Sequence, residues 1–148
     1  MDSYELNQET LAVIGISENR CKILEGNREY IIDKPAYEVM DDSCQYFGSS
    51  YDGRVKGTRK ILGIKYKIPV IVEESTKMIF FPIESPLINT CTWISLNNFK
   101  DVYINMNKTN IVFRNGKKIV TNISSASINN QLLRSTRLES ILNYRKNH

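Results

Sequence analysis

Short runs of apolar and β-branched residues, separated by tight-turn signals, constrain the fold of this 148-residue chain more than any other feature. The strongest signal is Asn115-Gly116, which stands between two such runs and is typical of a two-residue β-hairpin turn. Gly26-Asn27 separates two earlier runs in the same way. The pattern therefore predicts mostly antiparallel β-structure built from consecutive hairpins.

The expected strands fall into an N-terminal meander and a longer second series. The meander is predicted to contain strands at 10–16, 21–25 and 28–32. The second series is predicted to contain strands at 68–72, 78–81, 92–96, 102–105, 110–114 and 118–123. The turns of the last three strands are expected at 107–109 and at Asn115-Gly116.

One internal helix and one C-terminal helix complete the predicted fold. The internal helix should begin near Pro35 and end at Gly48, residue types that favour a first turn and a helix end. Its expected apolar stripe consists of Tyr37, Met40, Cys44 and Phe47. The last helix should run from Ser125 or Ser127 to Tyr144, and its expected buried face consists of Ile128, Leu132, Leu138, Ile141 and Leu142.

The fold class predicted from these elements is α+β. A mostly antiparallel sheet, either curved or forming a partly open barrel, is expected to be covered by the two helices. The length suits one domain over residues 1–148 with its own core. Trp93, Phe80 and Phe81 lie in apolar runs and are predicted to pack in that core instead of stacking on bases.

Residues 44–60 bring aromatic residues, small residues, three glycines and cations together in one segment. The part after Gly48 is predicted to be a loop up to about Thr58. From Arg54 to Lys67 the sequence has no acidic residue and six cations, namely Arg54, Lys56, Arg59, Lys60, Lys65 and Lys67. Such a segment suits a polyanion, most often nucleic acid. The alternative is an ordinary surface loop with solvated cations.

The net charge of +4 hides a strong asymmetry along the chain. Residues 1–50 contain ten acidic and four basic residues, which gives −6, whereas residues 51–148 contain six acidic and sixteen basic residues, which gives +10. A distribution of this kind indicates a polyanion-binding body with an acidic lobe.

A second group of cations surrounds the predicted hairpin and extends to the last helix. Arg114, Lys117 and Lys118 flank Asn115-Gly116, and a basic hairpin tip can enter a DNA groove. Arg134 on the last helix is a further candidate for a secondary DNA contact. Exposed turns and solvent-facing helix sides also carry cations for solubility, so the solvated alternative stays open for this group.

The sequence lacks the residues of the common catalytic and metal sites. The only histidine is His148, and three scattered cysteines have no metal-ligand spacing. Residues 48–54 approach the spacing of a P-loop but have Arg54 in place of its lysine. Asp41 and Asp42 are adjacent on the expected helix, so their side chains should diverge. We therefore expect no enzyme activity, no cofactor and no bound metal.

Cysteine usage and the absence of targeting signals suggest a compartment. The odd number of cysteines and their spacing favour free thiols in a reducing cytoplasm. The acidic N-terminus does not look like a signal peptide, and no apolar run approaches the roughly 18 residues of a membrane span. A cytoplasmic protein without a membrane partner is expected.

Three runs of residues resemble one protein family. The run 47–54, Phe-Gly-Ser-Ser-Tyr-Asp-Gly-Arg, followed by Gly57-Thr58, resembles a signature of the bacterial competence transcription factors, the ComK family. The runs Ile-Phe-Phe-Pro at 79–82, Ser-Pro at 85–86 and Cys-Thr-Trp-Ile-Ser at 91–95 resemble a second signature in the same order and spacing. Asn-Gln-Leu at 130–132 matches a third similarity, so the resemblance covers most of the chain.

The resemblance implies a function for the basic segment. Members of this family bind A/T-rich boxes as multimers, largely through the minor groove, and activate DNA-uptake genes. The implied partners are double-stranded DNA and further copies of the chain. The candidate DNA-binding residues are Ser49, Tyr51, Arg54, Lys56, Arg59, Lys60, Lys65 and Lys67.

Two further expectations accompany this interpretation. Family members usually extend past the final helix into a tail tied to activation and adaptor-guided proteolysis, whereas this sequence ends at His148. The resemblance therefore favours DNA binding over activation or contact with an adaptor and protease. The alternative function is a non-catalytic β-rich interaction module that binds an acidic protein or an anionic lipid.

Overall fold

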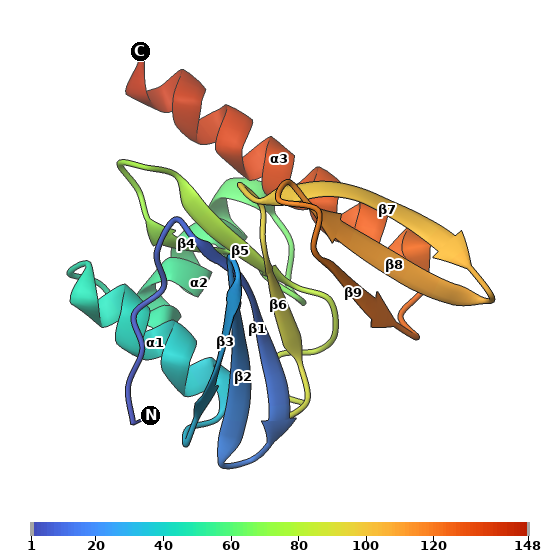
Figure 1. Ribbon diagram of the computed structural model, residues 1–148. Helices are drawn as coiled ribbons and strands as arrows, with labels where there is room; N and C mark the ends of the chain where they lie inside the picture. Colours follow the sequence, from blue (N-terminus) through green and yellow to red (C-terminus); the bar gives the residue numbers. More distant parts are fainter. Residues whose placement is uncertain (1, 148) are drawn as a thin grey trace.

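The structure is a computed structural model that describes residues 2–147, and it confirms the α+β class. Within this range nine strands form two open antiparallel sheets, and three helices pack against them (Figure 1). The sheets are separate and do not close, so the architecture is not a partly open barrel.

The larger sheet has six strands in the order β3-β2-β1-β6-β5-β4. In that order their bounds are Arg28–Ile32, Arg20–Glu25, Thr10–Ser17, Thr92–Ser95, Met78–Pro82 and Val70–Glu73. The pairing of β1 with β6 joins the N-terminal meander to the later strands, with Val13 opposite Trp93. The predicted meander and the first three strands of the predicted second series therefore form one sheet across this strand pair.

The smaller sheet consists of β7 (Phe99–Asn105), β8 (Lys108–Phe113) and β9 (Lys118–Thr121), and it projects away from the larger sheet (Figure 1). The predicted turn at Asn115-Gly116 is confirmed, and Gly116 has a φ of 90° that favours glycine. The turn expected at 107–109 begins one residue earlier, because Met106 and Asn107 take the positive φ values and Lys108 already belongs to β8.

The helices are α1 (Ala36–Tyr46), α2 (Tyr51–Leu62) and α3 (Ser125–Lys146). The prediction of a single internal helix was wrong, because most of the segment expected to be a glycine-rich loop is α2. The apolar stripe expected on α1 was partly wrong. Met40 and Cys44 are buried, but Tyr37 and Phe47 are exposed, and the buried face is completed by Ala36, Val39 and Ser43.

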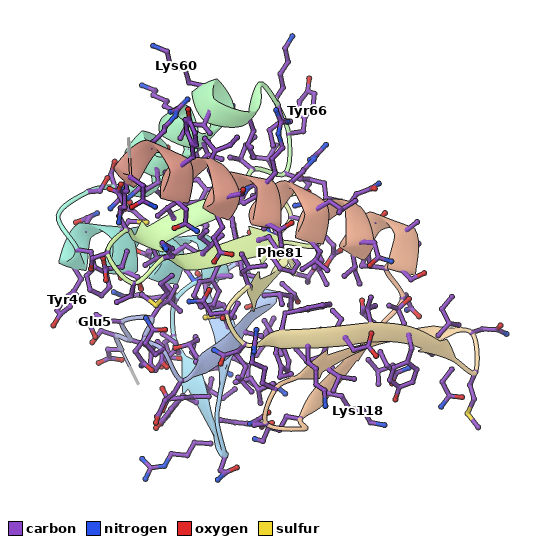
Figure 2. The ribbon with its side chains drawn as sticks, turned by 90° about the horizontal axis from the view of Figure 1, so that it is seen from above. Glu5, Tyr46, Lys60, Tyr66, Phe81 and Lys118 are labelled. Atoms are coloured by element: carbon purple, nitrogen blue, oxygen red, sulfur yellow. The ribbon has the colours of Figure 1, made fainter. Side chains whose placement is uncertain are left out.

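Two apolar cores lie on opposite faces of the larger sheet, since neighbouring strand residues alternate between them. Val13 and Phe80 face the first core together with α1, whereas Ala12 and Phe81 face the second core together with α3 and the smaller sheet. Phe81 lies beneath α3 in Figure 2. Trp93, Phe80 and Phe81 are buried, as predicted.

Gln131 ties α3 to the rest of the molecule by a polar contact inside the second core region. Its buried side-chain amide donates hydrogen bonds to the carbonyl oxygens of Lys67, at 2.9 Å, and Pro82, at 2.7 Å. Lys67 lies between α2 and β4, and Pro82 ends β5. One side chain therefore fixes α3, the end of β5 and the segment after α2 relative to one another.

We predict that Gln131→Ala lowers the free energy of unfolding by about 3 kcal/mol, because one buried and one partly buried carbonyl group lose their donor. Chemical denaturation followed by circular dichroism measures the change. Asn130→Ala on the exposed side of the same helix is the matched control and should stay within about 0.5 kcal/mol of the parent protein. Equal effects of the two substitutions would show that the Gln131 contacts do not hold α3 in place.

Candidate nucleic-acid interface

Local capping favours a helix over residues 51–62 despite two internal glycines. The Ser50 side chain accepts a hydrogen bond from the backbone N–H of Gly53 at 3.0 Å, which satisfies one of the free donors of the first turn. Gly63 ends the helix in the left-handed conformation with a φ of 67°. Asp52 in the first turn and Arg59 in the last complement the helix dipole.

A carboxylate of α1 also holds the start of α2. Asp41 accepts a hydrogen bond from the backbone N–H of Tyr51 at 2.9 Å. Asp42 turns the other way and forms an ion pair with Lys34 at 2.8 Å. The two carboxylates diverge, as predicted, and Asp41 has a structural role that the sequence did not reveal.

The inner side of α2 packs across the edge of the larger sheet. Val55 joins the first core and Leu62 joins the second, so the helix contributes to both. Tyr51 lies edge-to-face with Trp93, with ring centroids 6.0 Å apart and an interplanar angle of 87°. Burial raises the pKa of Tyr51 to about 12, which keeps its hydroxyl group protonated at neutral pH.

A cleft of about 520 Å³ lies beside α2, and we call it the basic cleft. Its walls come from α2, from the segment between α2 and β4, and from the turn after β5. The lining residues are Tyr51, Asp52, Val55, Lys56, Arg59, Lys65, Tyr66, Lys67, Ile68, Ser85, Pro86 and Leu87. The first resembling run and the Ser-Pro of the second therefore meet at one site, although more than thirty residues separate them in the sequence.

The electrostatic character of the basic cleft is strongly positive. Its lining holds one acidic residue, Asp52, and four cations, Lys56, Arg59, Lys65 and Lys67. The ion pairs found within residues 2–147 involve Arg20, Lys22 and Lys34, and none of the cleft cations takes part in them. The acidic N-terminal part thus pairs with its own bases and leaves the cleft charges available to a polyanion.

The structure brings five of the eight candidate DNA-binding residues into the basic cleft, and these are Tyr51, Lys56, Arg59, Lys65 and Lys67. Lys60 is exposed on the outer side of α2. Ser49 is half-buried in the turn between α1 and α2. Arg54 lies on another flank of the helix, two residues and about 200° of helical rotation from Lys56.

Arg54 is directed toward α1 and not into the basic cleft. Burial raises the pKa of the Cys44 thiol on α1 to about 12, and the nearby charge of Arg54 acts against that shift. The Arg54 side chain is half-buried, and its buried Nε has no hydrogen-bond partner. A DNA contact by Arg54 therefore stays a prediction. Such a contact would lie on the flank of α2 that faces away from the basic cleft.

The secondary cations do not form one group. Arg134 on α3 donates hydrogen bonds to the carbonyl oxygen of Tyr66 and to the side-chain oxygen of Gln131, both at 3.1 Å, so it lies beside the basic cleft. Figure 2 shows Lys60 and Tyr66 near one edge of the molecule and Lys118 on the other side of α3. Lys118 therefore cannot extend the surface formed by the basic cleft.

The hairpin between β8 and β9 is docked on the body of the protein. The side-chain amide of Asn115 donates a hydrogen bond to the Gly26 carbonyl oxygen at 3.1 Å, which joins this hairpin tip to the turn between β2 and β3. Arg114 and Lys118 are exposed beside the docked tip, and Lys117 is half-buried. The tip is not a free projection of the kind that enters a groove.

Sequence reasoning did not select seven of the residues that line the basic cleft as DNA contacts, namely Asp52, Val55, Tyr66, Ile68, Ser85, Pro86 and Leu87. Tyr66 is 79% exposed and Leu87 is 94% exposed, which are high values for residues of these types. Their signal in the sequence is weak, because only the structure places the turn after β5 opposite α2.

Other chemistry is not supported in the described part of the chain. No cluster of three metal-ligating side chains occurs among residues 2–147, and His148 lies outside them. Cys21, Cys44 and Cys91 are buried free thiols, and burial raises the pKa of Cys91 to about 12. None of the described helices is long and apolar enough to cross a membrane.

Comparison with known proteins identifies the family of this chain. The model of the ComK protein family matches residues 1–147. The chain belongs to the ComK family. The competence transcription factor of Bacillus subtilis (strain 168) is 34% identical to it over 152 residues, which cover 100% of this chain and 79% of that relative. No solved structure matches the chain significantly. ComK proteins are non-enzymatic transcription factors.

We predict that Gly57→Ala stabilises this ComK protein by about 1 kcal/mol, because alanine loses less backbone freedom than glycine in a helix. A Cβ atom at Gly57 would meet nothing within 4 Å. Thermal unfolding should show a melting temperature about 2–4 °C higher. The control Gly63→Ala should be destabilising, since Gly63 has a φ of 67°. A lower melting temperature for Gly57→Ala would contradict the helix described here.

Proposed function

We propose that this ComK-family chain binds double-stranded DNA at A/T-rich boxes, largely through the minor groove, with the basic cleft as its contact surface. In this proposal it binds as an oligomer and activates competence genes. The observation that carries the proposal is the set of four cleft cations without ion-pair partners, at the place where two of the resembling runs meet.

The dimensions of DNA favour contact by side chains over insertion of a helix. An α-helix with its side chains is about 10–12 Å wide, whereas the minor groove is about 6 Å wide. We infer that α2 lies along the sugar–phosphate backbone and that long side chains such as Lys56 and Arg59 reach the groove. A-tracts narrow the minor groove and strengthen its negative potential, which attracts inserted Arg and Lys side chains.

The two glycines inside α2 support a close approach of the DNA backbone. Gly53 and Gly57 are exposed, and neither needs a positive φ. Each glycine lowers the stability of the helix by up to about 1 kcal/mol relative to alanine. No neighbouring atom requires a glycine at position 57, because a Cβ atom there would meet nothing within 4 Å. They leave a flat strip on the outer side of α2 between Lys60 and Arg54, where a phosphate chain can approach the helix backbone.

Transcription activation and oligomerisation rest on family membership. The relative in Bacillus subtilis is named a competence transcription factor, and the present chain covers most of its length. Binding to paired boxes by more than one copy is consistent with the sheets, which have edge strands at β3, β7 and β9. A mobility-shift titration with one box and with two correctly spaced boxes would measure that cooperativity.

We predict that binding to A/T-rich DNA weakens with salt at a log–log slope of about −4 to −5, as expected for roughly five neutralised phosphates per protomer. Replacing Lys56 and Arg59 together by alanine should make the slope shallower by about 2. Mobility-shift titrations at several ionic strengths, with a GC-rich duplex for comparison, measure both effects.

The matched control for that double substitution is the pair Lys117→Ala and Lys118→Ala, which removes the same charge from the docked hairpin. Its slope should stay near that of the parent protein. An equal loss for both pairs would mean that DNA responds only to net charge, and salt-independent binding would refute the proposed DNA contact.

A further inference from the structure

A tight turn at residues 85–88 forms the wall of the basic cleft opposite α2. The backbone N–H of Ile88 donates to the Ser85 carbonyl oxygen at 3.0 Å, which closes a β-turn with Pro86 and Leu87 in its centre. The Ser85 hydroxyl oxygen also accepts a hydrogen bond from the Leu87 N–H at 3.3 Å. Pro86 fixes its own φ, so the position of Leu87 is set by three local restraints.

The base of this turn is anchored to the larger sheet. Gly15 of β1 donates its N–H to the Cys91 carbonyl oxygen at 3.1 Å, and Cys91 donates to Ile88 at 3.0 Å. A Cβ atom at Gly15 would lie 2.2 Å from the Asn89 carbonyl oxygen. Glycine at this position therefore allows the chain after the turn to lie directly on β1, and the turn projects from a rigid support.

This hydrogen-bonded turn presents an apolar side chain to solvent. Leu87 is 94% exposed, and it lies across the cleft from Lys56 and Arg59. Ile88 beside it is 48% exposed, and Tyr66 on the facing segment is 79% exposed. Apolar side chains gathered at the mouth of a strongly basic cleft mark a surface that is covered when a partner binds.

We propose that Leu87 inserts as an apolar wedge between two base pairs of the A/T-rich DNA, from the minor-groove side, while the cleft cations hold the flanking phosphates. This inference rests on the DNA-binding function proposed above and adds a specific base contact to it. The geometry that supports it is the juxtaposition of a preorganised leucine with cations on the opposite wall of one cleft.

The chemistry of minor-groove recognition favours this assignment. Proteins that bind this groove insert leucine, isoleucine, proline and similar residues between base steps and partly unstack them. A narrow groove excludes a helix but admits a single branched side chain. Pyrimidine–purine steps such as TA unstack most easily, so a leucine wedge would add sequence preference that cations alone do not provide.

Two substitutions at Leu87 separate insertion from electrostatic attraction. Leu87→Ala should weaken binding to an A/T-rich box about tenfold or more, the expected loss for an apolar side chain of this size, and leave the salt slope unchanged. Leu87→Lys adds a positive charge to the cleft. It should still weaken binding if Leu87 is a wedge, whereas it should strengthen binding and steepen the slope if the contact is purely electrostatic.

The matched control is Leu133→Ala, because Leu133 is 67% exposed on α3 and does not line the cleft. Its affinity should equal that of the parent protein. Circular dichroism should show that all three variants keep the parental melting temperature, since both leucines are largely exposed. Any loss of affinity is then a loss of contact and not of folding.

Unstacking is measured directly with 2-aminopurine placed at successive adenines of the box. Binding of the parent protein should raise the fluorescence of 2-aminopurine at one base step. The Leu87→Ala variant at saturating concentration should show no such rise. Parental affinity in Leu87→Ala, or an unchanged fluorescence rise, would overturn the wedge while leaving DNA binding intact. Absence of binding by the parent protein would instead refute the proposed function and the wedge together.

Discussion

The packing of α2 across the edge of the larger sheet is the constraint on which the site depends. Val55 and Leu62 belong to different cores, so the rotation of the helix about its own axis is fixed from both sides of the sheet. That rotation directs Lys56 and Arg59 into the basic cleft and Arg54 toward α1. Gln131 then fixes the chain that leaves the helix, because it binds the carbonyl oxygen of Lys67. The position of each charge at the site therefore depends on buried contacts elsewhere.

The strands could be predicted because each lies next to a turn that is specified by the residues of the turn itself. The helix α2 was not predicted, because Gly53 and Gly57 lower its intrinsic propensity and resemble loop residues. Ser50 at its start and Gly63 at its end were visible signals of a helix. The two glycines act against these signals. The helix forms because Val55 and Leu62 are buried against the sheet, and this tertiary packing is not visible in the sequence. Local propensity was thus outweighed by packing that sequence patterns do not display.

The amino-acid types of the candidate site could be predicted from the sequence, but the directions of their side chains could not. A basic segment without acids indicates a candidate polyanion surface, yet a loop assignment cannot distinguish Arg54 from Arg59. In the helix these residues are five positions apart and point to different flanks, and only Arg59 lines the cleft. The position of Pro86 and Leu87 beside α2 could not be predicted from the sequence for another reason. They reach α2 through the strand order β6-β5-β4, which is a property of the whole sheet.

The division of the cleft into a cationic wall and an apolar turn has a consequence for specificity. Contacts between lysine or arginine and phosphates depend on salt but hardly on sequence, so they supply affinity for any duplex. In the proposed complex, a preference for A/T-rich boxes would come from groove width and from the ease of unstacking particular steps. We propose that Lys56 and Arg59 respond to the first property and Leu87 to the second. The restraints on the 85–88 turn matter for this reason, because a mobile leucine would lose entropy on insertion and discriminate less between steps.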